Sequence, residues 1–326
     1  MPSRAPSLTS VEGLQVGHAT DREAATGCTV VLAPPEGMAA AAAVRGRATG
    51  TRELDALSPH HLVPRIHAIL LTGGSAFGLG AADGVMRWLA ERGRGFNVGV
   101  GVVPIVPTAV VFDLALLGRS DRWPGPEDGY GACEAASTDL AEGSLGAGTG
   151  ATVGKVLGAA GAMKSGLGTW AEHRGDLVVG ALAVVNAFGD VRDASGRIIA
   201  GARHDGEFVD TRAFLAEGKA PVGSFGRTGG NTTLVVVGTN AQLERVQLSE
   251  MAATSVDALA QRITPLGTRV DGDIVFAVST GKQPEANPTT VELMAQSVAA
   301  TAIERAVRLA TGTREIPGLA DELAAT

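Results

Sequence analysis

Hydrophobic and polar positions divide this chain into two kinds of segment. Short apolar runs between Gly, Pro or polar clusters are typical of buried strands, and apolar residues spaced by three and four are typical of helices. The strand-like runs are Cys28–Ala33, Met38–Val44, Ile66–Leu71, Asp176–Asn186, Leu234–Val237 and Ile274–Ser279. The helical patterns are Leu79–Arg92, Gln242–Ile263, which stops before Pro265, and Thr289–Leu309, which ends before Gly312. The chain therefore combines core strands with amphipathic helices.

Two other segments need a different interpretation. Residues Ala187–Gly230 form a polar, Gly-rich connector with little periodicity, which predicts a long irregular segment of the kind that is often functional. The longest apolar region, Val98–Leu117, contains two prolines and Asp113. A membrane span is disfavoured there, and core strands joined by turns are expected.

Composition narrows the class of protein. With 326 residues, 45% of them hydrophobic, and a mean hydropathy of +0.17, the chain is globular and can bury a large core. Only 4% of residues are aromatic while 45 are glycine, which favours closely packed layers of small residues. A net charge of −7 and a pI near 5.4 give no electrostatic footprint for nucleic acid or anionic lipid.

Cysteine usage and the N-terminus bear on the compartment. Cys28 and Cys133 are far apart and form no CxxC pair, so neither a disulfide framework nor a zinc site is expected. The first residues lack the charged-then-apolar order of a signal peptide. A cytoplasmic protein is the expectation. His60, His61 and His67 have no Cys, Asp or Glu partner at helical spacing, so no metal site is expected from them.

The stretch around which the chain is organised is Gly229–Thr233, directly before the apolar run Leu234–Val237. Gly and Asn tolerate positive φ and favour a turn, so Thr232 stands where a turn becomes a strand. A Thr hydroxyl in mid-chain is a poor nucleophile, whereas an N-terminal Thr carries its own base, an α-amine of pKa about 7.7 to 8.0. Cleavage between Asn231 and Thr232 would create that residue. The alternative is an ordinary Asn-containing turn.

A pair of carboxylates precedes the second strand of this region. Asp271 and Asp273 begin the run Ile274–Ser279, one helix after the Thr232 strand. If the two strands are neighbours, these side chains face one side of the sheet and can orient the amine or hydroxyl of Thr232. An Asp-Gly turn entering a strand is the simpler alternative.

Two glycine-rich segments resemble known catalytic or phosphate-binding motifs but do not match them. In Thr72–Gly78, Ser75 is excluded as an elbow nucleophile because Phe77 stands where G-x-S-x-G needs glycine. Its glycines, Gly74 among them, favour a helix N-terminus that approaches backbone or an anionic group of a substrate. Gly143–Lys155 fails the phosphate-loop pattern, because five residues, not four, separate Gly148 from Gly154 and Val156 follows the Lys. This segment, which ends in Lys155, can still point donors at a developing oxyanion.

One further polar side chain belongs with these. Asn186 ends its apolar strand, where an Asn usually starts a turn. If its amide points into a cleft instead, it can donate to an oxyanion.

Together and in order, these motifs resemble the family of self-processing N-terminal-nucleophile-like hydrolases. That family contains the β-aminopeptidases, the L-aminopeptidase/D-amino-acid esterases and the nylon-oligomer hydrolases. The similarity covers nearly the whole chain and rests on Val16–His18, Thr72–Gly78, Pro104 and Pro107 with Phe112-Asp113, Gly146–Lys155, Asn186, Gly230–Thr233 and Asp271–Asp273.

The resemblance implies an α/β fold in the form of a four-layer αββα sandwich. It also implies one domain, 1–326, that cleaves itself between Asn231 and Thr232 into an α chain, 1–231, and a β chain, 232–326. No metal or organic cofactor is needed, and a homotetramer in the cytoplasm is expected.

The same resemblance assigns roles to site residues. Thr232 is the expected nucleophile, with Asp271 and Asp273 polarising and orienting it. Asn186 and Lys155 are expected to contact the oxyanion and the substrate.

Gly74, Ser75 and Phe112 are the residues expected to bind substrate. Phe112 stands where the nylon hydrolases carry a Tyr, so any role of that hydroxyl is absent. Thr232 with Asp-Gly-Asp is more similar to the nylon hydrolases than to the aminopeptidases, many of which have Ser and Ser-Gly-Glu in these places.

The expected activity is hydrolysis, through an acyl-enzyme, of amide bonds in short peptides, amino-acid amides or linear aliphatic oligoamides. One alternative is an acyltransferase of the ornithine acetyltransferase type, which needs an amine acceptor that outcompetes water. A second is an uncleaved, non-catalytic binding protein, which would migrate as one intact chain on a denaturing gel.

Overall fold

The computed structural model describes residues 5–114, 117, 119–219, 221–222, 230–283 and 286–324. Its helices are α1 (Ala81–Glu91), α2 (Pro126–Glu134), α3 (Thr211–Ala216), α5 (Arg245–Arg262), α6 (Pro288–Arg308) and α7 (Leu319–Ala324). Short 3-10 turns include η3 (Ser75–Gly80), η4 (Gly146–Gly148) and η5 (Lys155–Leu157). Within these ranges no helix is both long and apolar enough to cross a membrane.

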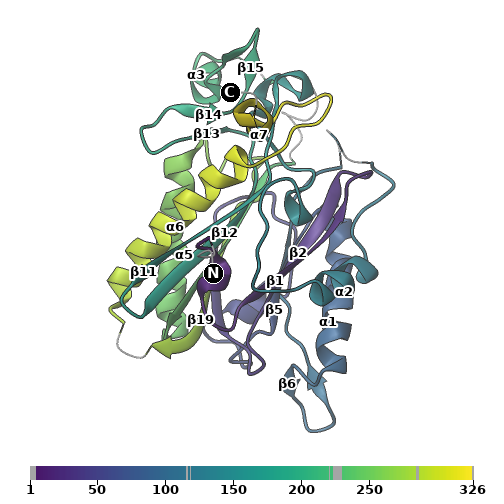
Figure 1. Cartoon of the computed structure of the whole chain (residues 1–326), viewed down its shortest axis with the longest axis vertical. Helices are drawn as coiled ribbons and strands as arrows, with labels where there is room; N and C mark the ends of the chain where they lie inside the picture. The colour runs from purple at the N-terminus through teal and green to yellow at the C-terminus, as the bar shows by residue number, and fades with distance from the viewer. Residues whose placement is uncertain are drawn as a thin grey trace.

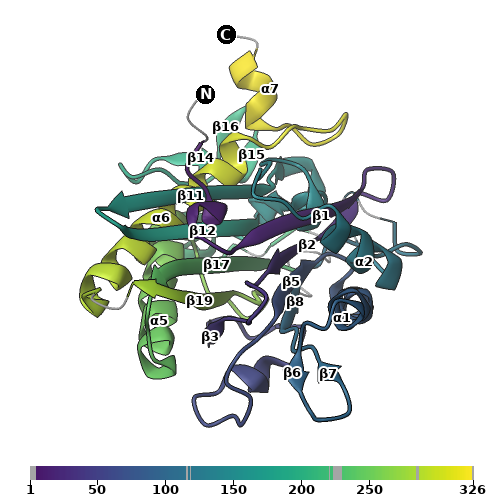
Figure 2. The ribbon, with the colours of Figure 1, turned by 60° about the horizontal axis from the view of Figure 1, so that its bottom comes forward.

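Two five-stranded sheets form the centre of the molecule. The first has the order β1-β2-β5-β8-β4 and the second the order β11-β12-β17-β19-β3. Figure 2 labels the strands of both sheets except β4. The first sheet consists of β1 (Gln15–Asp21), β2 (Thr26–Leu32), β5 (Ala68–Thr72), β8 (Thr108–Val110) and β4 (Thr51–Arg52). The second consists of β11 (Leu167–Arg174), β12 (Leu177–Asn186), β17 (Thr232–Ala241), β19 (Ile274–Gln283) and β3 (Ala39–Val44).

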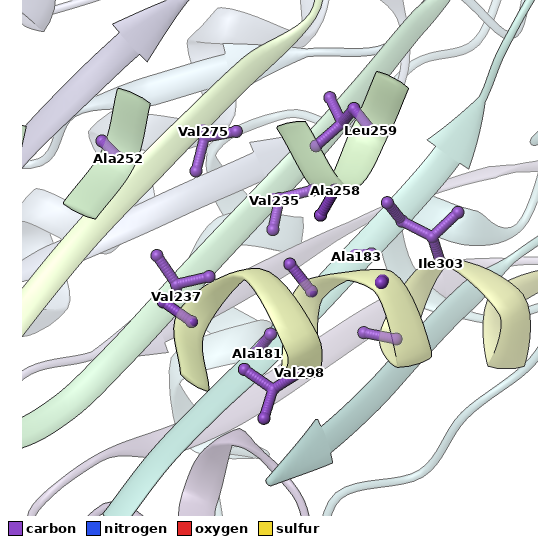
Figure 3. Packing of buried hydrophobic residues seen from close by; sticks show 14 of the residues in the cluster. Ala181, Ala183, Val235, Val237, Ala252, Ala258, Leu259, Val275, Val298 and Ile303 are labelled. Atoms are coloured by element: carbon purple, nitrogen blue, oxygen red, sulfur yellow. The ribbon is translucent and has the colours of Figure 1, made fainter. Parts of the chain in front are cut away.

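The sheets stack face to face, and a helix pair covers the outer face of each (Figure 1). Side chains alternate across β17: Leu234 and Val236 belong to the core between the sheets, whereas Val235 and Val237 pack toward α5 and α6. Figure 3 shows this outer core from close by. On the other side, α1 and α2 pack on β2 and β5. The expected four-layer αββα sandwich is confirmed.

The strands that follow Asn231 and Asp273 are neighbours, which is the arrangement that a joint site of Thr232 and the two aspartates requires. β17 and β19 pair in parallel, with Leu234 opposite Ile274, and an isolated parallel bridge extends the pairing to Asn231 and Asp271. Because the two strands are parallel, their starts lie at the same edge of the sheet, and α5 supplies the connection that parallel strands need. The predicted turn before Thr232 begins at Gly229, which lies outside the described residues.

The connector 187–230 is more ordered than its sequence predicts. Its described part contains α3 and four short strands: β13 (Asp190–Arg192), β14 (Ile198–Ala200), β15 (Arg203–His204) and β16 (Glu207–Phe208). Strands of two or three residues are too short to show a periodicity. The buried Asp190 carboxylate organises them by accepting from Ala202 N at 2.9 Å and from Thr211 N at 2.7 Å.

The bounds of other elements in the structure differ from the predicted bounds by a few residues. The helix expected over 242–263 begins at Arg245, because Glu244 takes the N-cap position and Gln242 N donates to Gln283 O instead. The apolar region 98–117 contributes β7 (Val102–Val103) and β8, and β7 forms a hairpin with β6 (Phe96–Asn97). The glycine-rich segment 143–155 holds η4 and β9 (Thr152–Val153), which pairs with β10 (Met163–Lys164), while β13 also pairs with β18 (Ile263–Thr264).

Candidate active site

The bond between Asn231 and Thr232 lies at the first residue of β17, inside the molecule. Asn231 is 1% and Thr232 is 4% exposed. Thr232 has the same parity along the strand as Leu234 and Val236, whose side chains lie between the sheets. The strand therefore directs the Thr232 hydroxyl toward the first sheet, at the edge of the core.

The carbonyl oxygen of Asn231 accepts two hydrogen bonds. The Thr232 hydroxyl donates to it at 2.6 Å, and the backbone N–H of Gly272 donates at 2.8 Å. An N–H fixed on a carbonyl oxygen polarises that carbonyl and stabilises negative charge that develops on it. The Asn231 carbonyl is thus held between the Thr232 hydroxyl and the Gly272 N–H.

Gly272 can take this place because it has no side chain. A Cβ atom there would lie 2.8 Å from Thr232 Oγ1 and 2.7 Å from Ala48 O. The sequence pattern drew attention to the two aspartates of Asp271-Gly272-Asp273, but the backbone between them makes the direct contact.

A segment of the first half of the chain holds this Asp-Gly-Asp turn. The N–H groups of Arg47 and Ala48 donate to Asp271 O at 2.7 and 2.9 Å, and that of Arg45 donates to Asp273 O at 2.9 Å. Sequence reasoning missed this segment, because backbone donors leave no mark in the residue pattern. It follows β3, which pairs with β19 at the edge of the second sheet.

The two carboxylates are buried and hydrogen-bonded to backbone. Asp273 Oδ1 accepts from Thr233 N at 2.7 Å, and Asp271 Oδ2 accepts from Thr268 N at 2.7 Å. Burial, with the neighbouring Asp271 charge, raises the pKa of Asp273 to about 7, and burial raises the pKa of Asp271. Asp273 Oδ2 has no hydrogen-bond partner within the described part of the chain. A carboxylate that titrates near neutrality beside a nucleophile suits general acid–base chemistry.

Lys155 and Asn186 form a second buried pair next to the same bond. Lys155 Nζ donates to Asn186 Oδ1 at 2.7 Å and to Asn186 O at 3.1 Å. Burial lowers the pKa of Lys155 well below its ordinary value. The Asn186 amide donates to Gly230 O at 3.1 Å and to Phe112 O at 3.0 Å. Asn186 therefore fixes the backbone of Gly230, the residue before Asn231, while the Asn231 carbonyl accepts from Gly272 N.

A pocket of about 350 Å³ opens onto the Asn231–Thr232 bond. Its wall is made of small, apolar and hydroxyl-bearing residues: Ala48, Thr49, Gly50, Ser75, Ala76, Val110, Phe112, Gly230, Asn231 and Thr232. Ser75 and Phe112, two residues expected to bind substrate, line it. Gly74 lies one residue outside the lining, in the left-handed region at φ +78°, where an added Cβ would lie 2.5 Å from Trp123 Cβ.

The structure thus brings together the residues that the sequence singled out. Thr232, Asp271 and Asp273 come from the two parallel strand ends, and Asn186 is the register partner of Thr232 on β12. Among the described residues, no group of three or more His, Cys, Asp or Glu side chains is placed to hold a metal ion.

Comparison with known proteins places this site in a family. The model of peptidase family S58 matches residues 6–314. The chain belongs to peptidase family S58. It is therefore a hydrolase that acts on amide bonds, and the resemblance noted from the motifs is confirmed.

Two curated relatives show the range of this family. The chain is 44% identical over 290 residues to an uncharacterised aminopeptidase of Mycobacterium tuberculosis, which covers 84% of this chain and 81% of the relative. It is 32% identical over 278 residues to a 6-aminohexanoate-oligomer endohydrolase of a Kocuria species. That match covers 82% of this chain and 73% of the relative.

A solved structure confirms the fold class. The L-aminopeptidase D-Ala-esterase/amidase of Ochrobactrum anthropi, described as a variant of the N-terminal-nucleophile hydrolase fold, superposes with a TM-score of 0.68. The match covers 95% of this chain and 88% of that one at 19% identity.

Proposed function

We propose that this S58 hydrolase cleaves its own Asn231–Thr232 bond and then uses Thr232 as an N-terminal nucleophile. The observation that carries the proposal is the pair of hydrogen bonds on Asn231 O, from the Thr232 hydroxyl at 2.6 Å and from Gly272 N at 2.8 Å. The hydroxyl and the oxyanion donor of a self-acylation are both adjacent to the bond to be cut.

Maturation begins when Thr232 Oγ1 attacks the carbonyl carbon of Asn231. The hydroxyl proton passes to a neighbouring base, Gly272 N–H stabilises the oxyanion, and the C–N bond breaks as the nitrogen takes up a proton. This gives an ester between Asn231 and Thr232. Water then hydrolyses the ester and frees the Asn231 carboxylate. The α chain ends at Asn231 and the β chain begins at Thr232.

Turnover uses the groups that the cut releases. The new α-amine of Thr232 takes the proton of its own hydroxyl, which attacks the substrate amide. The acyl-enzyme forms as the leaving amine is protonated, and water hydrolyses it. Asp273 Oδ2, a buried acceptor without a partner in the described chain, supports the protonated amine. Asn186 and Lys155 orient the acyl group.

The substrate class follows from the pocket and the family. The pocket is lined by small and apolar side chains such as Ala48, Ala76 and Val110, together with the hydroxyls of Thr49 and Ser75. A pocket with this lining suits short peptides, amino-acid amides or linear aliphatic amides. Both an aminopeptidase and an aliphatic-oligoamide hydrolase are among the relatives.

Intact mass spectrometry of the denatured protein tests the proposal. The wild type is expected to give two species that split between Asn231 and Thr232. Thr232→Val, which keeps shape but removes the hydroxyl, is expected to give one full-length species without activity. Thr232→Ser is the matched control and is expected to be cut, because it keeps the hydroxyl. L-alanyl, β-alanyl and 6-aminohexanoyl p-nitroanilides then rank the substrates.

Two outcomes would contradict the proposal. A cut and active Thr232→Val protein would exclude Thr232 as the nucleophile. A wild type that stays full length through a long incubation would favour the uncleaved binding protein.

A further inference from the structure

Asp113 lies directly behind the pocket and takes no part in the chemistry above. It is 3% exposed. Its Oδ1 accepts from the backbone N–H of Gly74 at 2.7 Å, and its Oδ2 accepts from the Thr26 hydroxyl at 2.7 Å. Two buried lysines, Lys155 and Lys164, interact electrostatically with this carboxylate.

Two walls of the pocket meet at this carboxylate. Phe112, the residue before Asp113, lines the pocket, and its carbonyl accepts from Asn186 Nδ2 at 3.0 Å. The second wall comes from a different segment of the chain. There Gly74 directly precedes Ser75 and Ala76, which both line the pocket.

Several hydrogen bonds connect the stretch 72–76 with the stretch 111–113, among them the one from Val111 N to Thr72 O at 2.8 Å. The bonds nearest the pocket wall are that from Gly74 N to Asp113 Oδ1 and that from Ser75 N to Val111 O at 3.0 Å. The Asp113 bond is the one that a side-chain substitution removes. A hydrogen bond to a charged acceptor is also stronger than one between neutral groups.

We infer that Asp113 is a positioning residue for substrate binding, which holds the Gly74–Ala76 wall at a fixed distance from the Phe112 wall. Gly74 takes a left-handed conformation at φ +78°, and its N–H would be buried without that acceptor. The inference rests on the proposed function for its kinetic part only, because the geometry of the wall can be measured without turnover.

The test compares Asp113→Ala with Asp113→Asn. The Asn side chain keeps the shape and can still accept from Gly74 N, while its amide donates to the Thr26 hydroxyl. With the p-nitroanilide that the wild type cleaves best, Asp113→Ala is expected to raise KM about tenfold with little change in kcat. Asp113→Asn is expected to restore the wild-type KM. Thr26→Val loses only the hydrogen bond from the Thr26 hydroxyl to Asp113, and its KM is expected to lie between those of the two Asp113 variants.

Glu142→Ala is the matched control. Glu142 also accepts from a backbone N–H, that of Thr169 at 2.8 Å, but it holds β11. It is expected to leave KM unchanged. A purely structural role for Asp113 would lower the yield of folded enzyme without this split between KM and kcat.

Hydrogen–deuterium exchange of the peptide over 73–80 supplies the readout that needs no substrate. Faster exchange in Asp113→Ala, and wild-type exchange in Asp113→Asn, are expected. Unchanged exchange in Asp113→Ala would overturn the inference whatever the enzyme hydrolyses. If the wild type cleaved none of the amides, the proposed substrate class would fail, and the exchange data alone would decide the role of Asp113.

Discussion

Asn186 and Thr232 stand directly opposite each other in the antiparallel pairing of β12 with β17. Asn186 also holds the carbonyl of Gly230 through its amide, at 3.1 Å. The strand pairing and this side chain thus fix the backbone on both sides of Asn231. The amide of Asn186 is therefore occupied in this structure. Under the proposed self-cleavage, it becomes available to a substrate only if the residues that end at Asn231 move away after the cut.

The contact between Gly272 and Asn231 leads to the first prediction. Gly272→Ala places a methyl group 2.8 Å from Thr232 Oγ1 and 2.7 Å from Ala48 O, which displaces the N–H from the Asn231 carbonyl. Loss of one oxyanion donor typically slows such a step by about 10² to 10³. We expect self-cleavage to slow by that factor, measured as the half-time of the full-length species by intact mass.

Gly80→Ala is the control for this substitution. Gly80 has helical dihedral angles, and nothing lies within 4 Å of the Cβ that it would gain. It is expected to mature at the wild-type rate. Equal maturation of Gly272→Ala and Gly80→Ala would remove Gly272 from the mechanism.

The buried pair of Lys155 and Asn186 leads to the second prediction. Lys155→Met keeps the length of the side chain but removes both hydrogen bonds to Asn186, at 2.7 and 3.1 Å. Burial already penalises the charged lysine, so an apolar replacement is expected to leave Tm unchanged or higher. Self-cleavage and turnover are nevertheless expected to fall by at least about tenfold, because Asn186 loses its orientation.

The experiment asks whether Lys155→Met lowers activity without lowering Tm. Thermal unfolding and maturation rate are compared in the same preparation. A lower Tm with normal cleavage would assign Lys155 a purely structural role.

Much of the site could be read from the sequence because its side chains end or begin strong strand patterns. Thr232, Asp271 and Asn186 lie at the ends of apolar runs, and the parallel pairing of β17 with β19 brings the first two together. The family motifs imply the roles of these residues, which stay predictions. The tetramer and the cytoplasmic location stay predictions.

Other parts of the site left no such pattern. The N–H groups of Gly272, Arg47 and Ala48 act through the backbone, and any residue except proline carries that donor. Asp113 was noticed as part of a motif, yet its bond to Gly74 joins two segments that are 39 residues apart. Periodicity within one segment cannot predict a contact between two.

The raised pKa of Asp273 leads to the last prediction. An aspartate in the unfolded chain titrates near 3.9, whereas burial and the Asp271 charge raise the pKa of Asp273 to about 7 in the fold. The folded protein thus binds this proton more tightly than the unfolded chain does. The ionised side chain costs stability above about pH 7, and that cost disappears as the pH falls toward 4.

Asp273→Asn removes the charge and keeps the oxygen that accepts from Thr233 N. In an uncut Thr232→Val background, it is expected to raise Tm by about 2 °C or more at pH 8. This gain should narrow as the pH is lowered to about 5. Asp205→Asn, at a side chain that is 90% exposed, is the control and should leave Tm unchanged at both pH values. A stabilisation that grew as the pH fell would contradict the raised pKa, because it would mean that the fold favours the ionised form.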